Sequence, residues 1–343
     1  MPRIAMLTGG GDCPGLNAVI SAATRTLQDG GAQTVGLLDG WKGAVDGAMM
    51  ELNRDNTSHI IGQGGTILGT SRTNPYKKEG AVEKIKQTFA RLQIDGLIAI
   101  GGEDTLGVAT KLYEGEKIPV VGVPKTIDND LSATDFTFGF DTAVNIAVDS
   151  VDRIHTTAAS HHRCLVIEVM GRHAGWIAAY AGICGDADVT LVPEMKVDID
   201  EVCGVLRKNR ARGKKYNIVV ASEGITFKEG EFVTQQQELD SFGHVRLGGI
   251  GDLLAKMIEK KTGYETRAVV LGHLQRGGSP TAFDRMLGTR FGVQAGRMAL
   301  AKDWGKMAAL RGNDIVAVPL NVATGELKVL NDDFRSLVDL FSR

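Results

Sequence analysis

The densest set of chemically active side chains lies in the segment Pro124–Asp130. It reads Pro-Lys-Thr-Ile-Asp-Asn-Asp and directly follows an apolar run. A carboxylate beside a lysine stays ionised and can accept a proton from a substrate hydroxyl group, which makes Asp128 a candidate general base. An Asx-rich turn would explain the aspartates and Asn129 without any function. Such a turn does not need Lys125 and Thr126 as well, so we predict chemistry at this segment.

Two glycine-rich junctions could approach a phosphate group. Thr8–Asp12 reads TGGGD and Ile100–Thr105 reads IGGEDT, and each stands between an apolar run and a helical pattern. Consecutive glycines let phosphate oxygens reach backbone N–H groups, and a helix N-terminus adds partial positive charge. In the second junction, Glu103 and Asp104 could bind Mg²⁺, which prefers oxygen ligands. The alternatives are a tight turn in the first junction and capping carboxylates in the second.

Arginines stand beside glycines near the ends of other apolar runs. Arg side chains bind phosphate groups through paired N–H donors. Any one of them could be a solvated surface charge, but several at strand ends favour a phosphorylated substrate. The candidates are Arg72, Arg163, Arg172, Arg267 and Arg276, the last of which follows His273, Leu274 and Gln275.

Charge and cysteine content exclude several classes of protein. The 39 basic and 41 acidic residues give a net charge of −2, which does not favour nucleic-acid binding. The N-terminus does not resemble a signal peptide, and no apolar run reaches the roughly 18 residues of a membrane span. The four cysteines are dispersed without a CxxC pair, which suits reduced thiols and argues against a zinc site. We therefore expect a cytoplasmic protein without a nucleic-acid or membrane partner.

The candidate residues are positioned by strands that alternate with helices. The expected strands are 4–7, 97–100, 120–123, 165–169, 218–221 and 268–271, and the expected helices are 16–27, 105–113 and 140–158. This alternation predicts an α/β fold with mainly parallel sheets, in which ligands bind beyond the carboxyl ends of the strands. The polar stretch 227–249 is predicted to be a surface insertion.

Two common nucleotide-binding motifs are missing. Pro14 occupies the place of the third glycine of a dinucleotide-binding fingerprint, which disfavours a dehydrogenase, and no GxxxxGK[ST] sequence occurs. The GGED junction is similar to one in NAD and lipid kinases, but those classes do not explain the sequences MGR and GHLQRGG.

Taken together, these blocks resemble the phosphofructokinase family along nearly the whole chain. The matching blocks are Thr8–Ile20, Gly64–Arg72, Ile100–Thr105, Pro124–Asp130, Phe138–Ala143, Glu168–Trp176, Ser222–Gly224 and Glu265–Pro280. The resemblance implies two Rossmann-like three-layer α/β domains with the active site in the cleft between them. Residues 1–140, with part of the C-terminal region, would bind the phosphoryl donor. Residues 141–310 would bind the sugar phosphate, and residues 311–343 would pack back.

The resemblance also implies a reaction and a set of site residues. The reaction is Mg²⁺-dependent phosphoryl transfer to O1 of fructose 6-phosphate, a step of glycolysis, by a homodimer or homotetramer. By position, Asp128 resembles the base, Thr126 would hold the phosphoryl group, and Asp130 would support the charge balance and the metal. Lys125 would also be catalytic, since with Mg²⁺ it would stabilise the developing charge. The donor site would consist of Gly10, Gly11, Arg72, Asp104 and Lys125, with Glu103 at the metal position. The sugar-phosphate site would consist of Thr126, Ile127, Asp128, Arg163, Met170, Gly171, Arg172, Glu223, Arg267, His273, Leu274, Gln275 and Arg276, with Arg163 and Arg267 reaching in from a neighbouring subunit.

Asp104 and Lys125 bear on the identity of the donor. ATP-dependent bacterial members of the family usually have glycine at both positions. A carboxylate at 104 would block and repel the α-phosphate of a nucleotide, and the Lys125 ammonium would neutralise a small polyanion. The pair resembles the pyrophosphate-dependent members, in particular an actinobacterial-like group, although some ATP-dependent relatives also have the lysine. We therefore predict pyrophosphate as the donor, with an ATP-dependent phosphofructokinase and a non-catalytic sugar-phosphate-binding protein as alternatives.

Overall fold

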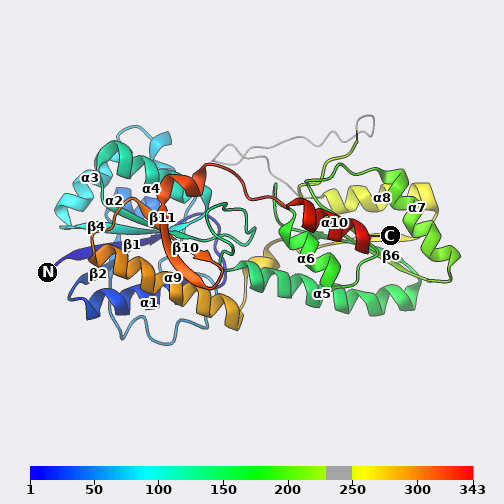
Figure 1. Ribbon diagram of the computed structural model, residues 1–343, viewed down its shortest axis with the longest axis horizontal. Coiled ribbons are helices and arrows are strands. Elements are labelled where there is room, and N and C mark those ends of the chain that lie inside the picture. The colour runs from blue at the N-terminus through cyan, green and yellow to red at the C-terminus, as the bar shows by residue number, and fades with distance from the viewer. Residues whose placement is uncertain (229–248, 343) are drawn as a thin grey trace.

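The computed structural model describes residues 1–228 and 249–342 of the chain (Figure 1). The predicted surface insertion at 227–249 lies almost entirely outside the described residues. The predicted strands and helices are present, and they form two α/β lobes that lie side by side. None of the described helices is long and apolar enough to cross a membrane.

The first sheet has seven strands within the described residues, in the order β11-β10-β5-β4-β1-β2-β3. The strands are β1 (Arg3–Thr8), β2 (Gln33–Leu37), β3 (Met49–Leu52), β4 (Gly96–Gly101), β5 (Val120–Pro124), β10 (Lys306–Arg311) and β11 (Asp314–Pro319). All neighbouring pairs are parallel except β2–β3 and β10–β11. The central strands are continuous apolar runs because helices cover both of their faces.

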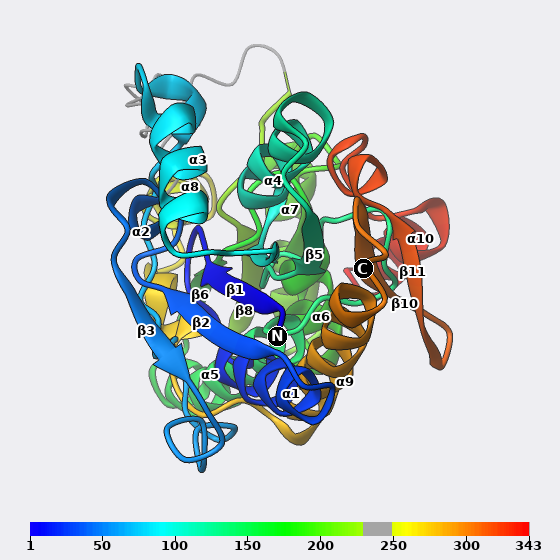
Figure 2. The ribbon, with the colours of Figure 1, turned by 90° about the vertical axis from the view of Figure 1, so that its left-hand side faces the viewer.

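The two faces of this sheet bury alternate residues of each strand. Ile4 and Met6 of β1 pack in one hydrophobic cluster with α1 (Leu16–Asp29) and α9 (Ala282–Leu300). Ala5 and Leu7 pack in the other, with α2 (Trp41–Asp46), α3 (Ala81–Arg91) and α4 (Glu103–Glu116). This separation follows from the two-residue period of a strand. Figure 2 shows α1 and α9 below the sheet and α3 and α4 above it.

The second sheet has four described strands, all parallel, in the order β7-β8-β6-β9. The strands are β6 (Cys164–Val169), β7 (Val189–Leu191), β8 (Asn217–Ser222) and β9 (Thr266–Val270). The helices α5 (Phe140–His161) and α6 (Trp176–Cys184) cover one face, and α7 (Ile199–Ala211) and α8 (Ile250–Thr262) cover the other. The C-terminal helix α10 (Asp332–Phe341) packs on α6 through a ring contact of Phe334 with Trp176, at 5.0 Å between centroids.

One segment of the chain belongs to a different domain from the one predicted for it. Residues 282–310 were expected in the sugar-phosphate half, but β10 pairs with β5, and α9 lies against α1. The glycines of α9 explain the close approach, since a β-carbon at Gly292 would lie 2.5 Å from the carbonyl oxygen of Val19. The chain therefore returns to the first sheet after β9, whereas α10 returns to the second.

Candidate active site

A pocket opens at the carboxyl ends of β1, β4 and β5, facing loops that follow the second sheet. Parallel strands bring their carboxyl ends to one edge, which is where ligands of open α/β sheets bind. The lining residues are Gly10, Gly11, Asp12, Gly102, Glu103, Asp104, Thr105, Lys125, Thr126, Ile127, Asp128, Asp130, Arg172 and Arg276. The structure thus brings together the two glycine junctions, the segment after β5 and two of the predicted arginines.

Lys125 connects two walls of this pocket. Its backbone N–H donates to the carbonyl oxygen of Gly101 at 3.0 Å, and its ammonium donates to the carbonyl oxygen of Gly11. The side chain is only 5% exposed, and burial lowers the pKa of Lys125. A buried ammonium at a glycine loop is a strong attractor for a polyanion, because the surroundings screen its charge weakly.

The glycine loop after β1 is fixed by residues of a distant segment. Gly10 has a φ of 80°, a conformation that favours glycine. The Thr70 hydroxyl donates to its carbonyl oxygen at 2.6 Å, and its N–H donates to the Ser71 carbonyl oxygen at 3.4 Å. Arg72, the predicted donor contact, is the next residue. It is exposed and is not among the described residues that line the pocket.

Helix α4 begins at Glu103, two residues earlier than predicted. Glu103 and Asp104 therefore occupy its first turn, where the helix dipole favours carboxylates. The N-cap residue of this helix is Gly102, which has no side chain to donate or accept a capping hydrogen bond. Both carboxylates nevertheless line the pocket, so the capping alternative does not remove them from the site.

The segment after β5 carries a perturbed pair of carboxylates. Burial, and then the charge of Asp130, raise the pKa of Asp128 to about 6, while Arg276, Arg172 and Lys125 oppose the shift. Burial also raises the pKa of Asp130. Oδ1 of Asp128 is buried without a hydrogen-bond partner among the described residues. A carboxylate with a free acceptor atom and a pKa near neutrality is suited to accept a proton from a bound hydroxyl group.

The opposite wall comes from loops of the second sheet. Arg172 has a φ of 47°, and its N–H donates to Oε1 of Glu223 at 3.3 Å. Burial, and then the charge of Asp128, raise the pKa of Glu223 to about 7. Glu223 thus fixes the backbone of the Met170-Gly171-Arg172 turn in an uncommon conformation, which aims the arginine at the pocket.

Gln275 fixes the same turn from the other side. It is fully buried, and its Oε1 accepts a hydrogen bond from the N–H of Met170 at 3.3 Å. It lies one residue before Arg276, which lines the pocket. His273 and Leu274 are exposed and are not among the described lining residues, and Leu274 is 69% exposed.

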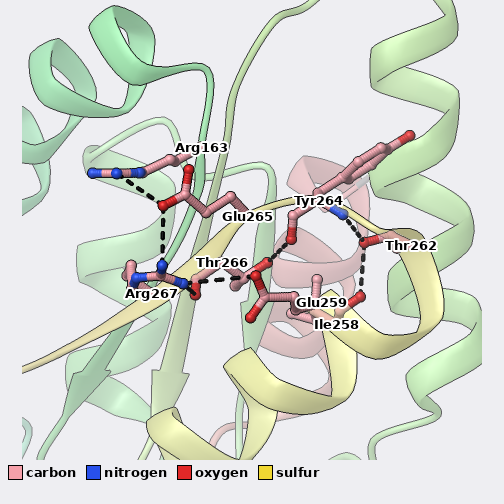
Figure 3. Close-up of polar contacts among 8 residues, drawn as sticks. All are labelled: Arg163, Ile258, Glu259, Thr262, Tyr264, Glu265, Thr266 and Arg267. Carbon is pink, nitrogen blue, oxygen red and sulfur yellow. Dashed lines mark hydrogen bonds and ion pairs between the residues drawn. The ribbon is translucent and has the colours of Figure 1, made fainter.

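Arg163 and Arg267 lie away from the pocket in this chain. They stand at the amino ends of β6 and β9, whereas the sugar-side turns follow the carboxyl ends. Figure 3 shows both guanidinium groups at Glu265, with N–O distances of 2.8 Å for Arg163 and 3.0 Å for Arg267. A single chain therefore does not bring these two predicted residues to the site.

Sequence reasoning missed four residues at or beside the pocket. Three of them, Asp12, Gly102 and Thr105, line the pocket. They belong to the two glycine-rich junctions already singled out, and that position in the sequence could have identified them. Lys328 contacts the backbone of Asp130 from far along the chain, and its sequence neighbourhood carries no motif.

The fold and the pocket define an α/β protein with two mainly parallel sheets and, between them, a pocket whose lining suits phosphorylated ligands. The family model Phosphofructokinase matches residues 3–299, and the chain belongs to this family. Over 340 residues it is 53% identical to the pyrophosphate--fructose 6-phosphate 1-phosphotransferase of Streptomyces coelicolor, covering 99% of both chains. It is 48% identical to the ATP-dependent 6-phosphofructokinase of Mycobacterium leprae, covering 96% of both. The structure of the pyrophosphate-dependent phosphofructokinase of Nitrosospira multiformis superposes with a TM-score of 0.85 at 21% identity, covering 99% of this chain and 91% of that one, which supports the fold.

Proposed function

We propose that this chain transfers a phosphoryl group from pyrophosphate to O1 of fructose 6-phosphate, giving fructose 1,6-bisphosphate and phosphate. The observation that carries the choice of donor is the pairing of Asp104 with Lys125 on the donor side of one pocket. The buried ammonium attracts a small polyanion, whereas the carboxylate opposes the additional phosphate of a nucleotide. The relatives named for pyrophosphate agree with this choice.

The transfer needs little covalent chemistry from the protein. As the bond between O1 and the transferred phosphorus forms, the O1 proton passes to Asp128. The bond from that phosphorus to the bridging oxygen breaks, and phosphate leaves with the electron pair. Positioning and electrostatic stabilisation supply most of the catalysis in such reactions. Lys125, Arg172 and Arg276 provide the positive charge at this pocket.

A magnesium ion fits the donor set of the pocket. No group of three His, Cys, Asp or Glu side chains in the described part of the chain could hold a metal by itself. Mg²⁺ usually takes only one or two carboxylates and completes its shell with phosphates and water. Glu103 and Asp130 suit that role, since both line the pocket and the charge of Glu103 acts on Asp130. When bound, the ion would neutralise charge on the phosphates.

The remaining parts of the proposal concern the setting of the enzyme. We place the enzyme in the cytoplasm. We assign it to both glycolysis and gluconeogenesis, because pyrophosphate and the sugar phosphate product differ little in transfer free energy and the reaction can run in both directions. We also propose a homodimer or homotetramer in which Arg163 and Arg267 of one chain serve the sugar-phosphate site of another. Both arginines are partly exposed at one end of the second sheet, as this arrangement requires.

The test is formation of fructose 1,6-bisphosphate from fructose 6-phosphate and Mg²⁺, with pyrophosphate and ATP assayed separately. We expect turnover with pyrophosphate, and we expect the reverse reaction when fructose 1,6-bisphosphate and phosphate are supplied. Turnover with ATP alone would overturn the choice of donor and favour the second candidate, an ATP-dependent 6-phosphofructokinase, which the Mycobacterium leprae relative supports. Binding of the sugar phosphate without turnover on either donor would overturn the proposed catalysis.

A further inference from the structure

Residues 326–331 connect the two halves of the molecule near the pocket. They run from the 3₁₀ turn η3 (Leu320–Thr324) to α10, within the red stretch between β11 and α10 in Figure 1. Leu327 forms an antiparallel bridge with Leu131, and the Lys328 N–H donates to the carbonyl oxygen of Asp130 at 2.8 Å. Two residues later, the Leu330 N–H donates to Oε1 of Glu194 at 3.0 Å. The segment therefore contacts the Asp128–Asp130 turn before it reaches the second sheet.

The Lys328 side chain bonds Asn129 of this turn and two backbone carbonyl groups that follow the turn. Its ammonium donates to Oδ1 of Asn129 at 3.0 Å and to the carbonyl oxygens of Thr134 and Asp135 at 3.0 and 2.8 Å. These acceptors match the three donors of an ammonium group. The ammonium also lies 5.6 Å from the centre of the Trp176 ring, and the Trp176 indole N–H donates to the Lys328 carbonyl oxygen at 2.8 Å.

Asn129 is the residue that gives the turn its shape. It lies between the two carboxylates and has a φ of 52°, in the left-handed region. Such a conformation persists only where the surroundings hold it. Here Oδ1 of Asn129 accepts from the Thr137 N–H at 3.1 Å and from Lys328. The direction in which Asp128 and Asp130 leave the backbone thus depends on both bonds.

We propose that Lys328 is a positioning residue that holds the Asp128–Asp130 turn in its reactive arrangement through Asn129. The side chain is not among the described lining residues of the pocket, so its effect on the reaction passes through the turn. This inference rests on the proposed function in one respect: it takes Asp128 to be the base. It does not depend on which donor is used.

The position of Lys328 separates its effect from substrate binding. The predicted donor and sugar contacts outside residues 126–130 remain in place when its side chain changes, whereas the direction of Asp128 does not. A misplacement of about 1 Å costs on the order of 100-fold in rate. Loss of Lys328 is therefore expected to lower kcat and to leave the KM values for both substrates nearly unchanged.

The experiment compares Lys328→Met, Lys328→Arg and Lys306→Met in the full-length enzyme. Lys328→Met is expected to lower kcat by about 10- to 100-fold with both KM values within about threefold, and Lys328→Arg, which retains a cation with several donors, to recover most of kcat. Lys306 is a matched surface lysine that pairs with Asp303, and its change is expected to leave kcat unaltered. A kcat of Lys328→Met within twofold of the unmodified enzyme would overturn the proposal, as would an equal loss in both Lys328 variants.

Two further measurements keep the outcomes distinct. If Lys328→Met does not fold by circular dichroism, Asn129→Ser replaces it, because this change removes the amide acceptor and keeps the lysine. A lower kcat at unchanged KM then supports the proposal, and an unchanged kcat overturns it. Turnover of the unmodified enzyme with each donor is measured first, so a wrong choice of donor is detected separately, and the Lys328 comparison is made with the donor that works.

Discussion

The guanidinium group of Arg276 lies directly over Gly11, so that a β-carbon at residue 11 would approach its Nη1 atom to 2.6 Å. Gly11 belongs to the loop after β1 of the first sheet, and Arg276 ends the 3₁₀ turn η2 (Gly272–Arg276) that follows β9 of the second. The proposed donor loop and the proposed sugar-phosphate loop therefore touch at one point. Any other residue at position 11 would therefore have to displace the guanidinium group of Arg276.

Gly11→Ala is expected to displace Arg276 and to impair both substrates. At 2.6 Å the new methyl group and the guanidinium cannot coexist, so the arginine moves away from the pocket. We expect kcat/KM to fall by about 10- to 100-fold, as for other losses of alignment, in assays that vary each substrate in turn. The matched control is Gly115→Ala in α4, where a β-carbon meets no atom within 4 Å. The control is expected to stabilise the helix by about 0.5–1 kcal/mol without changing activity, and an equal loss in both variants would contradict the argument.

Asp128→Asn is expected to lower turnover strongly and to stabilise the fold. Without the base, kcat falls by about 10²- to 10⁴-fold. The stability effect follows from the pKa of Asp128, which is raised from 3.8 to about 6 in the folded state. Ionised Asp128 therefore destabilises the protein fully above pH 6, and this cost disappears as the pH falls below the unfolded value. We expect a gain of about 1–3 kcal/mol at pH 8 and a much smaller one near pH 4, both measured by urea denaturation.

The control for this variant is Asp152→Asn on the exposed face of α5. It is expected to leave turnover unchanged. If Asp128→Asn retained turnover, another group would be the base. If it lost turnover and also destabilised the protein at pH 8, the buried carboxylate would have a stabilising partner, contrary to the unpaired Oδ1 atom.

The sequence was sufficient where local signals and chemistry coincide. The first turn after β5, both glycine junctions and Arg172 were identifiable because strand patterns end at them, and all of them line one pocket. The predicted start of α4 lay two residues beyond the observed one. Glu103 and Asp104 are favourable in the first turn of a helix, but the same residues are also common in loops, so the sequence did not decide between the two. The pairing of β10 with β5 and the bonds of Lys328 to residues 129–135 join segments almost 200 positions apart. Neither leaves a periodic pattern in the sequence, so both needed the folded structure.

Asp284 is expected to be essential for stability and secondary for chemistry. Its Oδ2 atom accepts the N–H of Thr142 at 2.8 Å and the Thr142 hydroxyl at 2.5 Å, which joins the first turns of α9 and α5. Asp284→Ala would leave both donors buried without an acceptor, at a cost of about 1–3 kcal/mol each. Asp284→Asn keeps an acceptor oxygen, and it removes a buried carboxyl whose pKa burial raises to about 6. Urea denaturation is expected to show a loss of about 2–4 kcal/mol for the alanine variant and at most half of that for asparagine. Equal losses would assign the effect to packing.

Asp104→Gly tests the basis of donor selection. The carboxylate lies in the first turn of α4 and faces the pocket with Glu103, Lys125 and Gly11. Removing it takes away negative charge and bulk where a nucleotide would continue beyond its terminal phosphates, so we expect measurable turnover with ATP and a weaker preference for pyrophosphate. The gain is expected to be modest, because Lys125 still attracts the small polyanion and glycine destabilises the helix end.

The measurement for this prediction is the ratio of kcat/KM for pyrophosphate to kcat/KM for ATP. Asp104→Asn is the matched control: it removes the charge and keeps the volume, so a change of the ratio in both variants points to repulsion and a change in the glycine variant alone points to space. A ratio unaltered in both would place the selection outside α4, and Lys125→Gly would then be the next variant to measure.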